Sequence, residues 1–473
     1  MTSYKKTLRG IAVLGALVAA ATAHADLKVG VDLSSTGPAA VIGITSKNAM
    51  LMWPDTIAGQ KADYIILDDG SDPGAAVRNI HKLINEDHVD VIVGPNITPA
   101  AMAALDPVAE SQTPMITLVG SASVVEPQEG KRVWAFKMAQ TDSAMADVMT
   151  RYMSDHNVKT VGFIGFADGY GESWLNEFSK FAALRHIQLV ATERFNRTDA
   201  SVTGQVLKVM AARPDAILIA GAGTPTVLPQ RTLIERGFRG AIYQTHGIAT
   251  PEFIKLGGKD VEGTLFPTQP VVVARTLPAD HPAKKAALAF VSAYEAKYGP
   301  GSVTQFAGDA AGVYPRLQDA VARALKTAQP GTPAFRVALR DELEHAHELV
   351  VPNGVVNTSA KDHVGLDQRA SVMGIIRDGK FVYLSQCAWR AGNPARPATL
   401  GSPESTSTRP WASRNALHPR QSVVRLAAHQ PATPPRRPPV SRTAFLSRRR
   451  TRLSALSHLL SRENHSPNGH AFL

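Results

Sequence analysis

Short apolar runs alternate with longer amphipathic stretches through the first 250 residues, and this alternation constrains the fold more than any other feature. Eight apolar runs have the length and composition of β-strands: Leu27–Leu33, Tyr64–Asp68, Val89–Gly94, Pro114–Thr117, Thr160–Phe166, Leu189–Phe195, Ala216–Ala220 and Ala241–Gln244. Six stretches between them have helical periodicity: Pro73–Asn85, Thr98–Gln112, Thr141–His156, Gly171–Arg185, Val202–Arg213 and Thr224–Arg236. Strands about 25 to 30 residues apart with a helix between them indicate βαβ crossovers and parallel sheets.

The number of these units predicts two lobes. About eight strands before residue 250 exceed one comfortable sheet. Runs such as Val91-Ile92-Val93 and Ile217-Leu218-Ile219 are apolar on both faces, as strands covered by helices on both sides are. We therefore predict the α/β class, with two Rossmann-like lobes of parallel sheet.

The first 25 residues have the pattern of a signal peptide. Lys5, Lys6 and Arg9 precede an apolar run from Ile11 to Ala23, and Ala23-His24-Ala25 supplies a small-x-small cleavage site. The run is shorter than the roughly 20 apolar residues that a membrane span requires. We expect export and cleavage after Ala25.

The net charge of +11 is unevenly distributed along the chain. The residues from Cys387 onward contain 14 Arg, no Lys and two acids, a net +12, and the first 25 residues carry +3. The body between them is therefore slightly acidic and lacks the basic footprint of a protein that binds nucleic acid or a membrane surface. Cys387 is the only cysteine, so no disulfide can form within the body.

The composition changes abruptly at the end of the body. We expect a last strand pair, Met373–Arg377 and Phe381–Leu384, joined by the turn Asp378-Gly379. From Cys387 the chain has 87 residues with 11 Pro and neither Lys nor Asp, a composition that predicts a disordered, dispensable tail. A shifted reading frame of a GC-rich gene would produce such a composition. A polybasic arm for anionic partners is the alternative.

Five motifs occur in order along the body and resemble those of the leucine/isoleucine/valine-binding proteins. They are Asp68-Asp69-Gly70-Ser71-Asp72-Pro73 with Ala76, Val93-Gly94-Pro95 before Thr98, Pro114-Met115-Ile116-Thr117 before Ser121, Gly169-Tyr170-Gly171-Glu172, and Gly263-Thr264. Each motif alone is weak, but five in register are fairly specific. The resemblance extends from Leu27 to Leu384.

This resemblance implies a type I periplasmic binding protein, with two lobes, three crossovers and a ligand cleft between the lobes. By analogy, residues 26–141 and 265–352 form lobe 1, and residues 142–264 and 353–386 form lobe 2. The implied function is the solute-binding component of an ABC importer. It would act as a periplasmic monomer without a cofactor, delivering a small carboxylate, such as a branched-chain amino acid or an aromatic or aliphatic acid, to a permease in the inner membrane. A ligand sensor of the same fold is the alternative.

Strand ends are an independent reason to expect the ligand at particular residues. Helix N-termini beyond parallel strands present free N–H groups to anions. Three polar segments follow predicted strands in this way: Ser34-Ser35-Thr36-Gly37-Pro38, Asn96-Ile97-Thr98-Pro99 and Val119-Gly120-Ser121. A single hydroxyl at such a place could equally be a helix cap, but several converging strand ends favour a binding site.

The resemblance implies roles for individual residues. Thr98 and Ser121 match positions that hydrogen-bond the ligand's head group, and Val119 matches one that contributes backbone. Tyr170 matches an aromatic residue that the opposite lobe presents to the ligand.

One residue departs from the pattern of the amino-acid binders. His246 stands where they place the glutamate that pairs with the α-ammonium group. A neutral histidine is a poor counter-ion for a buried cation. Either Asp142 takes over this role, or the ligand lacks an ammonium group.

Other function classes find little support. The first strand leads into Ser-Ser-Thr-Gly-Pro and not into G-x-G-x-x-G, so a dinucleotide fingerprint is absent. His345 and His347 fall on different faces of a predicted helix, and Asp68, Asp69 and Asp72 lack EF-hand spacing. We therefore expect neither an enzyme nor a metal site, and only the Arg-rich tail would support nucleic-acid binding.

Overall fold

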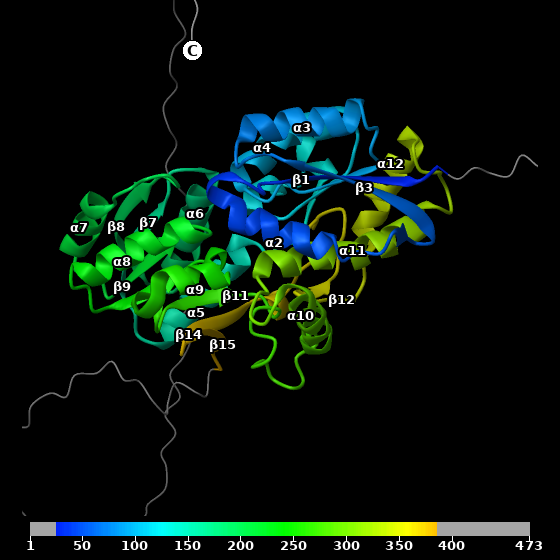
Figure 1. Cartoon of the computed structure of the whole chain (residues 1–473). Helices are drawn as coiled ribbons and strands as arrows, with labels where there is room; N and C mark the ends of the chain where they lie inside the picture. Colours follow the sequence, from blue (N-terminus) through cyan, green and yellow to red (C-terminus); the bar gives the residue numbers. More distant parts are fainter. Residues whose placement is uncertain (1–24, 386–473) are drawn as a thin grey trace, which may run out of the picture. The chain divides into compact units, whose positions relative to one another are not determined.

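The structure, a computed structural model, describes residues 25–385 (Figure 1). Residues 1–24 of the expected signal segment, and the expected tail from Cys387, lie outside these residues. The predicted α/β fold with two lobes is confirmed: two parallel-dominated sheets, each covered by helices, carry the described part of the chain. Among residues 25–385, no helix combines the length and the apolar content needed to cross a bilayer.

The first lobe is built on a six-stranded sheet in the order β2-β3-β1-β4-β5-β6. Its neighbours pair in parallel except for β2, which forms an antiparallel hairpin with β3. The strands are β1 (Leu27–Leu33), β2 (Thr56–Ile57), β3 (Gln60–Asp68), β4 (Val91–Val93), β5 (Met115–Thr117) and β6 (Ala135–Lys137). Strands β4, β5 and β6 are buried along their whole length, which explains the continuous apolar sequence of β4.

Helices cover both faces of this sheet. Helix α2 lies in the crossover from β1 to β3, and α3 lies in the crossover from β3 to β4. Because right-handed crossovers in opposite directions along a sheet place their helices on opposite faces, α2 covers one face and α3 the other. Helix α2 packs against α11, and α3 packs against α4 (Figure 1). The helices are α2 (Ala40–Met50), α3 (Pro73–Asn85), α4 (Thr98–Glu110), α10 (Lys284–Tyr298), α11 (Gln305–Ala324) and α12 (Pro333–Glu342).

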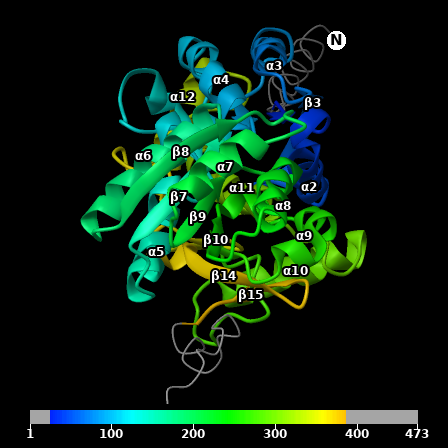
Figure 2. The same ribbon diagram turned by 90° about the vertical axis from the view of Figure 1, so that its left-hand side faces the viewer.

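The second lobe contains a seven-stranded sheet in the order β15-β14-β11-β10-β9-β7-β8. Strands β14 and β15 are antiparallel and close one edge of it (Figure 2). The strands are β7 (Thr160–Phe166), β8 (Gln188–Phe195), β9 (Ala216–Ala220), β10 (Ala241–Gln244), β11 (Leu265–Thr268), β14 (Val372–Arg377) and β15 (Lys380–Tyr383). Helix α5 packs on α6, whereas α7, α8 and α9 pack in a row. These helices are α5 (Asp142–Asp155), α6 (Gly169–Leu184), α7 (Thr203–Ala211), α8 (Val227–Glu235) and α9 (Pro251–Gly257).

The lobe boundaries differ from those expected. Residues 265–268 were assigned to lobe 1, but they form β11, which pairs with β10 and β14 in the second sheet. Residues after 353 were assigned to lobe 2, but β13 (Gly354–Val356), paired with β12 (Leu349–Val351), and the buried Leu366 and Ala370 join the core of the first lobe. The chain therefore leaves the second lobe after β11 and returns to it only at β14.

Candidate functional site

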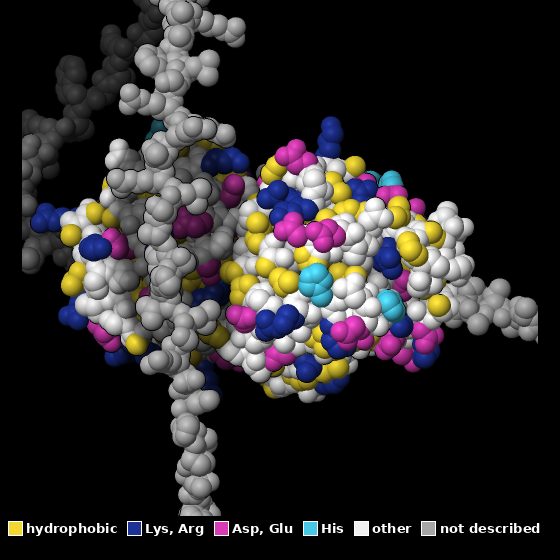
Figure 3. Space-filling model, turned by 90° about the horizontal axis from the view of Figure 1, so that it is seen from above, with side chains coloured by type: hydrophobic (Ala, Val, Ile, Leu, Met, Phe, Trp, Pro, Cys, Tyr) yellow, Lys and Arg dark blue, Asp and Glu magenta, His cyan; other side chains and the backbone are white. Residues whose placement is uncertain are grey.

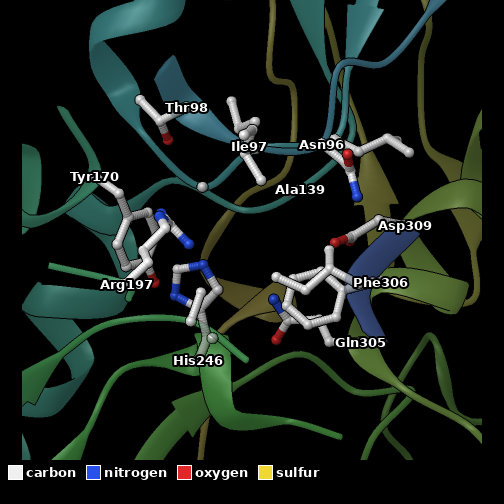
Figure 4. A pocket seen from close by; sticks show the side chains of 16 residues that line it. Asn96, Ile97, Thr98, Ala139, Tyr170, Arg197, His246, Gln305, Phe306 and Asp309 are labelled. Atoms are coloured by element: carbon white, nitrogen blue, oxygen red, sulfur yellow. The ribbon is translucent and has the colours of Figure 1, made fainter. Parts of the chain in front are cut away.

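A pocket lies where the strand order of each sheet reverses. The reversal falls between β1 and β4 in the first sheet and between β7 and β9 in the second, and ligands of open α/β sheets bind at such points. The residues that line the pocket come from both lobes: Ile42, Asn96, Ile97, Thr98, Leu118, Val119, Gly120, Ala139, Tyr170, Arg197, Ala222, His246, Gly247, Gln305, Phe306 and Asp309 (Figure 4). The cavity between them measures about 20 Å³, room for roughly one water molecule, so the lobes are closed on each other.

The first lobe contributes the loop between β4 and α4. Asn96 is held by its Oδ1, which accepts a hydrogen bond from the Ser34 amide at 2.8 Å. Thr98 is the first residue of α4 and is 2 % exposed. Within the described chain, Asn96 Nδ2 and Thr98 Oγ1 have no hydrogen-bond partner. Both groups are therefore available to a ligand.

The second lobe contributes a positioned cation, Arg197. Asp168, the N-cap of α6, accepts hydrogen bonds from the amides of Tyr170 and Gly171. The second oxygen of Asp168 accepts from Arg197 Nε at 2.8 Å. The guanidinium lies over the Phe166 ring, 4.1 Å from its centroid, and its Nη1 has no partner among residues 25–385. Arg197 is thus fixed on two sides and open toward the pocket.

Tyr170 and His246 form the aromatic wall of the second lobe. The Tyr170 hydroxyl donates to Thr245 Oγ1 at 3.0 Å, which fixes the ring against the pocket. His246 follows β10, is 2 % exposed and contacts the rings of Tyr170 and Trp174. Burial, with a smaller effect of the Lys137 charge, lowers the pKa of His246 to about 3, so the ring is neutral at physiological pH.

Helix α11 forms a third wall that the sequence did not predict. Gln305, Phe306 and Asp309 project from its first two turns into the pocket (Figure 4). Asp309 is fully buried, and its Oδ1 accepts a hydrogen bond from Asn353 Nδ2 at 2.9 Å. Burial raises the pKa of Asp309 well above its ordinary value.

Four of the six predicted site residues line the pocket, namely Thr98, Val119, Tyr170 and His246, whereas Ser121 and Asp142 do not. The Ser121 hydroxyl lies 2.7 Å from that of Ser123 and donates to Ser173 of the second lobe at 2.9 Å. This bond ties the two lobes together beside the pocket.

Asp142 supports the pocket from behind. Its Oδ1 accepts hydrogen bonds from the amides of Ala122 and Ser143, and burial raises its pKa to about 6, an effect that the nearby Lys137 opposes. Lys137 is also fully buried and donates to the carbonyl oxygens of Gly120 and Ser121 at 2.7 and 3.1 Å. The two side chains hold the loop from 119 to 122 in place.

Arg197 and the α11 residues were missed for different reasons. Arg197 follows β8, so the strand-end rule that indicated Thr98 would have found it if applied to the second lobe. Asp309 lies in a helix without a preceding strand, and only the tertiary fold brings it to the cleft. Among residues 25–385, no three His, Cys, Asp or Glu side chains are grouped closely enough to hold an ion.

Two parallel sheets joined by repeated crossovers, with a closed polar cleft at their reversal points, define a two-lobed solute-binding protein. The family model described as "Periplasmic binding protein" matches residues 26–380. The chain belongs to this family, and the predicted resemblance to its leucine/isoleucine/valine-binding branch is confirmed. The members are solute-binding proteins of the periplasm.

Individual relatives agree with this assignment. An extracellular ligand-binding receptor from Rhodopseudomonas palustris HaA2 is 43 % identical, with a TM-score of 0.73 over 76 % of this chain and 100 % of the other. The Leu/Ile/Val-binding protein homolog 3 of Brucella melitensis is 24 % identical over 268 residues, 55 % of this chain and 72 % of that protein. A solute-binding protein of an R. palustris ABC transporter, solved with benzoate, shares the fold at 18 % identity, with a TM-score of 0.65 over 76 % and 96 % of the two chains.

Proposed function

We propose that this protein is the periplasmic solute-binding component of an ABC importer and that it binds a small carboxylate without an ammonium group. The signal segment would be removed after Ala25, and the partner would be a permease in the inner membrane. The names of the relatives support transport, since they include Leu/Ile/Val-binding proteins and an ABC solute-binding protein with benzoate. Two features of the cleft support the chemistry of the ligand: the unpaired groups of Arg197 and Thr98, and the neutral His246.

The observation that supports a carboxylate is the unpaired Nη1 of Arg197 beside the unpaired Oγ1 of Thr98. Both atoms are buried and lack partners within the described residues, and they face each other across the two lobes (Figure 4). A buried donor without a partner costs roughly 1–3 kcal/mol, and an anionic oxygen would satisfy both. Charge-assisted hydrogen bonds of this kind are the strongest that a side chain makes.

His246 favours a ligand that lacks an ammonium group. This residue takes the place of the glutamate of the amino-acid binders, and its low pKa leaves it neutral. An α-ammonium buried beside it would lack a counter-charge, at a cost of several kcal/mol. Asp142, the counter-ion suggested by the sequence, lies behind the loop from 119 to 122, and Asp309 stands at the other end of the cleft from Arg197 (Figure 4).

A calorimetric panel of benzoate, 4-methylpentanoate and leucine tests the proposal. We expect the two acids without an ammonium group to bind at least as well as leucine. Arg197→Gln should weaken the binding of each acid about 10- to 150-fold, because a hydrogen bond to a charged group contributes about 1.5–3 kcal/mol. Tight binding of leucine alone would contradict the proposal.

Arg194→Gln is the matched control. Arg194 also belongs to the second lobe and also pairs with an acid, Glu172, but both side chains are nearly half exposed and neither lines the pocket. Its replacement should leave the affinity unchanged. Equal losses in the two variants would show that Arg197 acts through the stability of the lobe and not through the ligand.

A further inference from the structure

The cleft is polar at both ends and apolar between them. Figure 4 shows Thr98, Tyr170 and Arg197 at one end, and Asn96 and Asp309 at the other. Figure 4 places Ile97 and the neutral His246 between these ends and Phe306 beside Asp309, so the space between the ends is lined by uncharged side chains. A carboxylate bound at Arg197 would therefore extend an apolar middle toward Asp309.

The second polar end has unsatisfied hydrogen-bonding capacity. Asp309 Oδ1 is occupied by Asn353, but Oδ2 is buried without a partner among the described residues. Asn96 Nδ2 and Gln305 Nε2 are also buried and have no hydrogen-bond partner among residues 25–385. Asp309 and Asn96 are at most 4 % exposed, so once the lobes close, water has little access to these atoms.

From this arrangement we propose that the ligand carries a hydroxyl oxygen at the end remote from its carboxylate, and that Asp309 and Asn96 recognise it. The ligand class is thus a hydroxylated aromatic or similarly apolar acid. This inference rests on the proposed function, because it takes the carboxylate to bind at Arg197. The hydroxyl would accept from Asn96 Nδ2 and donate to, or accept from, the Asp309 carboxyl group.

The surroundings of Asp309 favour a hydroxyl over an ammonium group. Its polar neighbours, Asn353 and Gln269, are neutral amides, and the charge of Lys137 acts on it as a smaller effect. Burial raises the pKa of Asp309, because the removal of water makes the charged form costly, and a carboxyl group accepts a hydrogen bond from a hydroxyl in either protonation state. A ligand without the hydroxyl would leave buried polar atoms unpaired, which is how such sites reject close analogues.

Calorimetry on the full-length protein with 4-hydroxybenzoate, benzoate and 4-(aminomethyl)benzoate tests the inference. We expect 4-hydroxybenzoate to bind at least about tenfold more tightly than benzoate. In Asp309→Val the ratio of the two affinities should fall to within about threefold. In Arg197→Gln both affinities should fall by a similar factor, so that the ratio persists.

Asp309→Asn is the conservative variant. It keeps the size of the side chain and a hydrogen bond to Asn353, and its amide can both donate and accept, so it should retain most of the hydroxyl preference. If Asp309→Val does not fold, Asp309→Asn still tests the inference, because its neutral amide can hydrogen-bond a hydroxyl but cannot serve as the counter-ion of an ammonium group. Tightest binding of 4-(aminomethyl)benzoate, lost in Asp309→Asn, would overturn the inference by showing that Asp309 pairs with a cation.

The failures of the two proposals are distinguishable. Equal affinity for benzoate and 4-hydroxybenzoate in the unaltered protein would overturn the role of Asp309 and leave the carboxylate site standing. No binding of either acid, with tight binding of leucine, would overturn the proposed function and this inference with it.

Discussion

At the scale of single residues, burial governs the chemistry of the cleft more than formal charge does. His246, Asp309, Asp142 and Lys137 are all buried, and in each case burial is the largest cause of a pKa displaced toward the neutral form. Removing water from these groups makes their charged forms costly. Under the proposed function the cleft would recognise its ligand largely through directed hydrogen bonds, and Arg197, paired with Asp168, would supply the positive charge for the carboxylate.

His246 makes the stability of the protein depend on pH. Its pKa is about 3 in the folded chain, against 6.5 for an unperturbed histidine, so the unfolded chain takes up this proton first. The stability from keeping the ring neutral is complete above about pH 6.5 and is lost as the pH falls toward 3. Between about pH 6 and pH 4, the advantage of the unaltered protein over His246→Gln should shrink by up to about 1.4 kcal/mol per pH unit.

Urea unfolding of both proteins across this pH range measures the effect. Other groups titrate in both chains, so the difference between the two unfolding free energies isolates His246. A difference that stays constant from about pH 7 to pH 4 would contradict the burial argument.

Residue roles could be predicted from the sequence only where a strand end specifies position. Thr98 follows a strand and begins a helix, so its place beside the cleft could be predicted from the strand end, whereas Tyr170 was predicted from the family resemblance alone. Ser121 also follows a strand, but the direction of its side chain is set by Ser173, which is 52 residues away. Asp309 reaches the cleft through tertiary packing alone.

At the scale of elements, a glycine lies at a point where the two lobes come very close together. A Cβ on Gly120 would lie 2.4 Å from His246 Nε2, nearer than atoms can pack, so the loop after β5 needs glycine there to meet the second lobe. Gly120→Ala should cost about 1–3 kcal/mol in the closed form only, which corresponds to roughly a 5- to 150-fold loss of affinity for benzoate. Calorimetry together with thermal unfolding of the unliganded protein tests this.

Gly204→Ala is the control for that variant. Gly204 lies in α7, and a Cβ there meets nothing within 4 Å. Alanine should leave the affinity unchanged and raise the stability by up to about 1 kcal/mol. If Gly120→Ala behaved in the same way, the contact between the lobes would not limit closure.

Elements with apolar runs were predictable even where they are short, as β4 and β5 are, and a short element that ends in a charged residue was not. The bounds of β1, β7, β9, β10 and α3 agree with those expected, because turn residues and helix caps delimit them. Strand β6 was missed since it has three residues and ends in Lys137, whose burial depends on carbonyl oxygens of another loop. Strand β11 was assigned to the wrong lobe because pairing with β14 is a long-range choice that local pattern does not encode.

At the scale of the whole molecule, the two-lobed body should be sufficient for folding and binding. Its cores are formed by residues between Leu27 and Leu384. A chain running from Asp26 to Gln386 should match the full-length protein in melting temperature and in affinity for benzoate. With ligand at about 100 times its dissociation constant, both should gain roughly 2.7 kcal/mol of stability. Thermal unfolding with and without benzoate measures this, and unfolding of the shortened chain would contradict it.

Closure of the cleft affects how fast a ligand dissociates from the protein. Because the walls of the cleft come from both lobes and bridges such as Ser121–Ser173 and Gln305–Ala249 join them, a molecule enclosed between the lobes would escape only after such bridges have broken. Escape then takes place through a shared opening step, whatever contacts a particular ligand makes inside. Ligands of different affinity would therefore share an upper limit on their dissociation rate, and residence time would be a property of the protein as much as of its cargo.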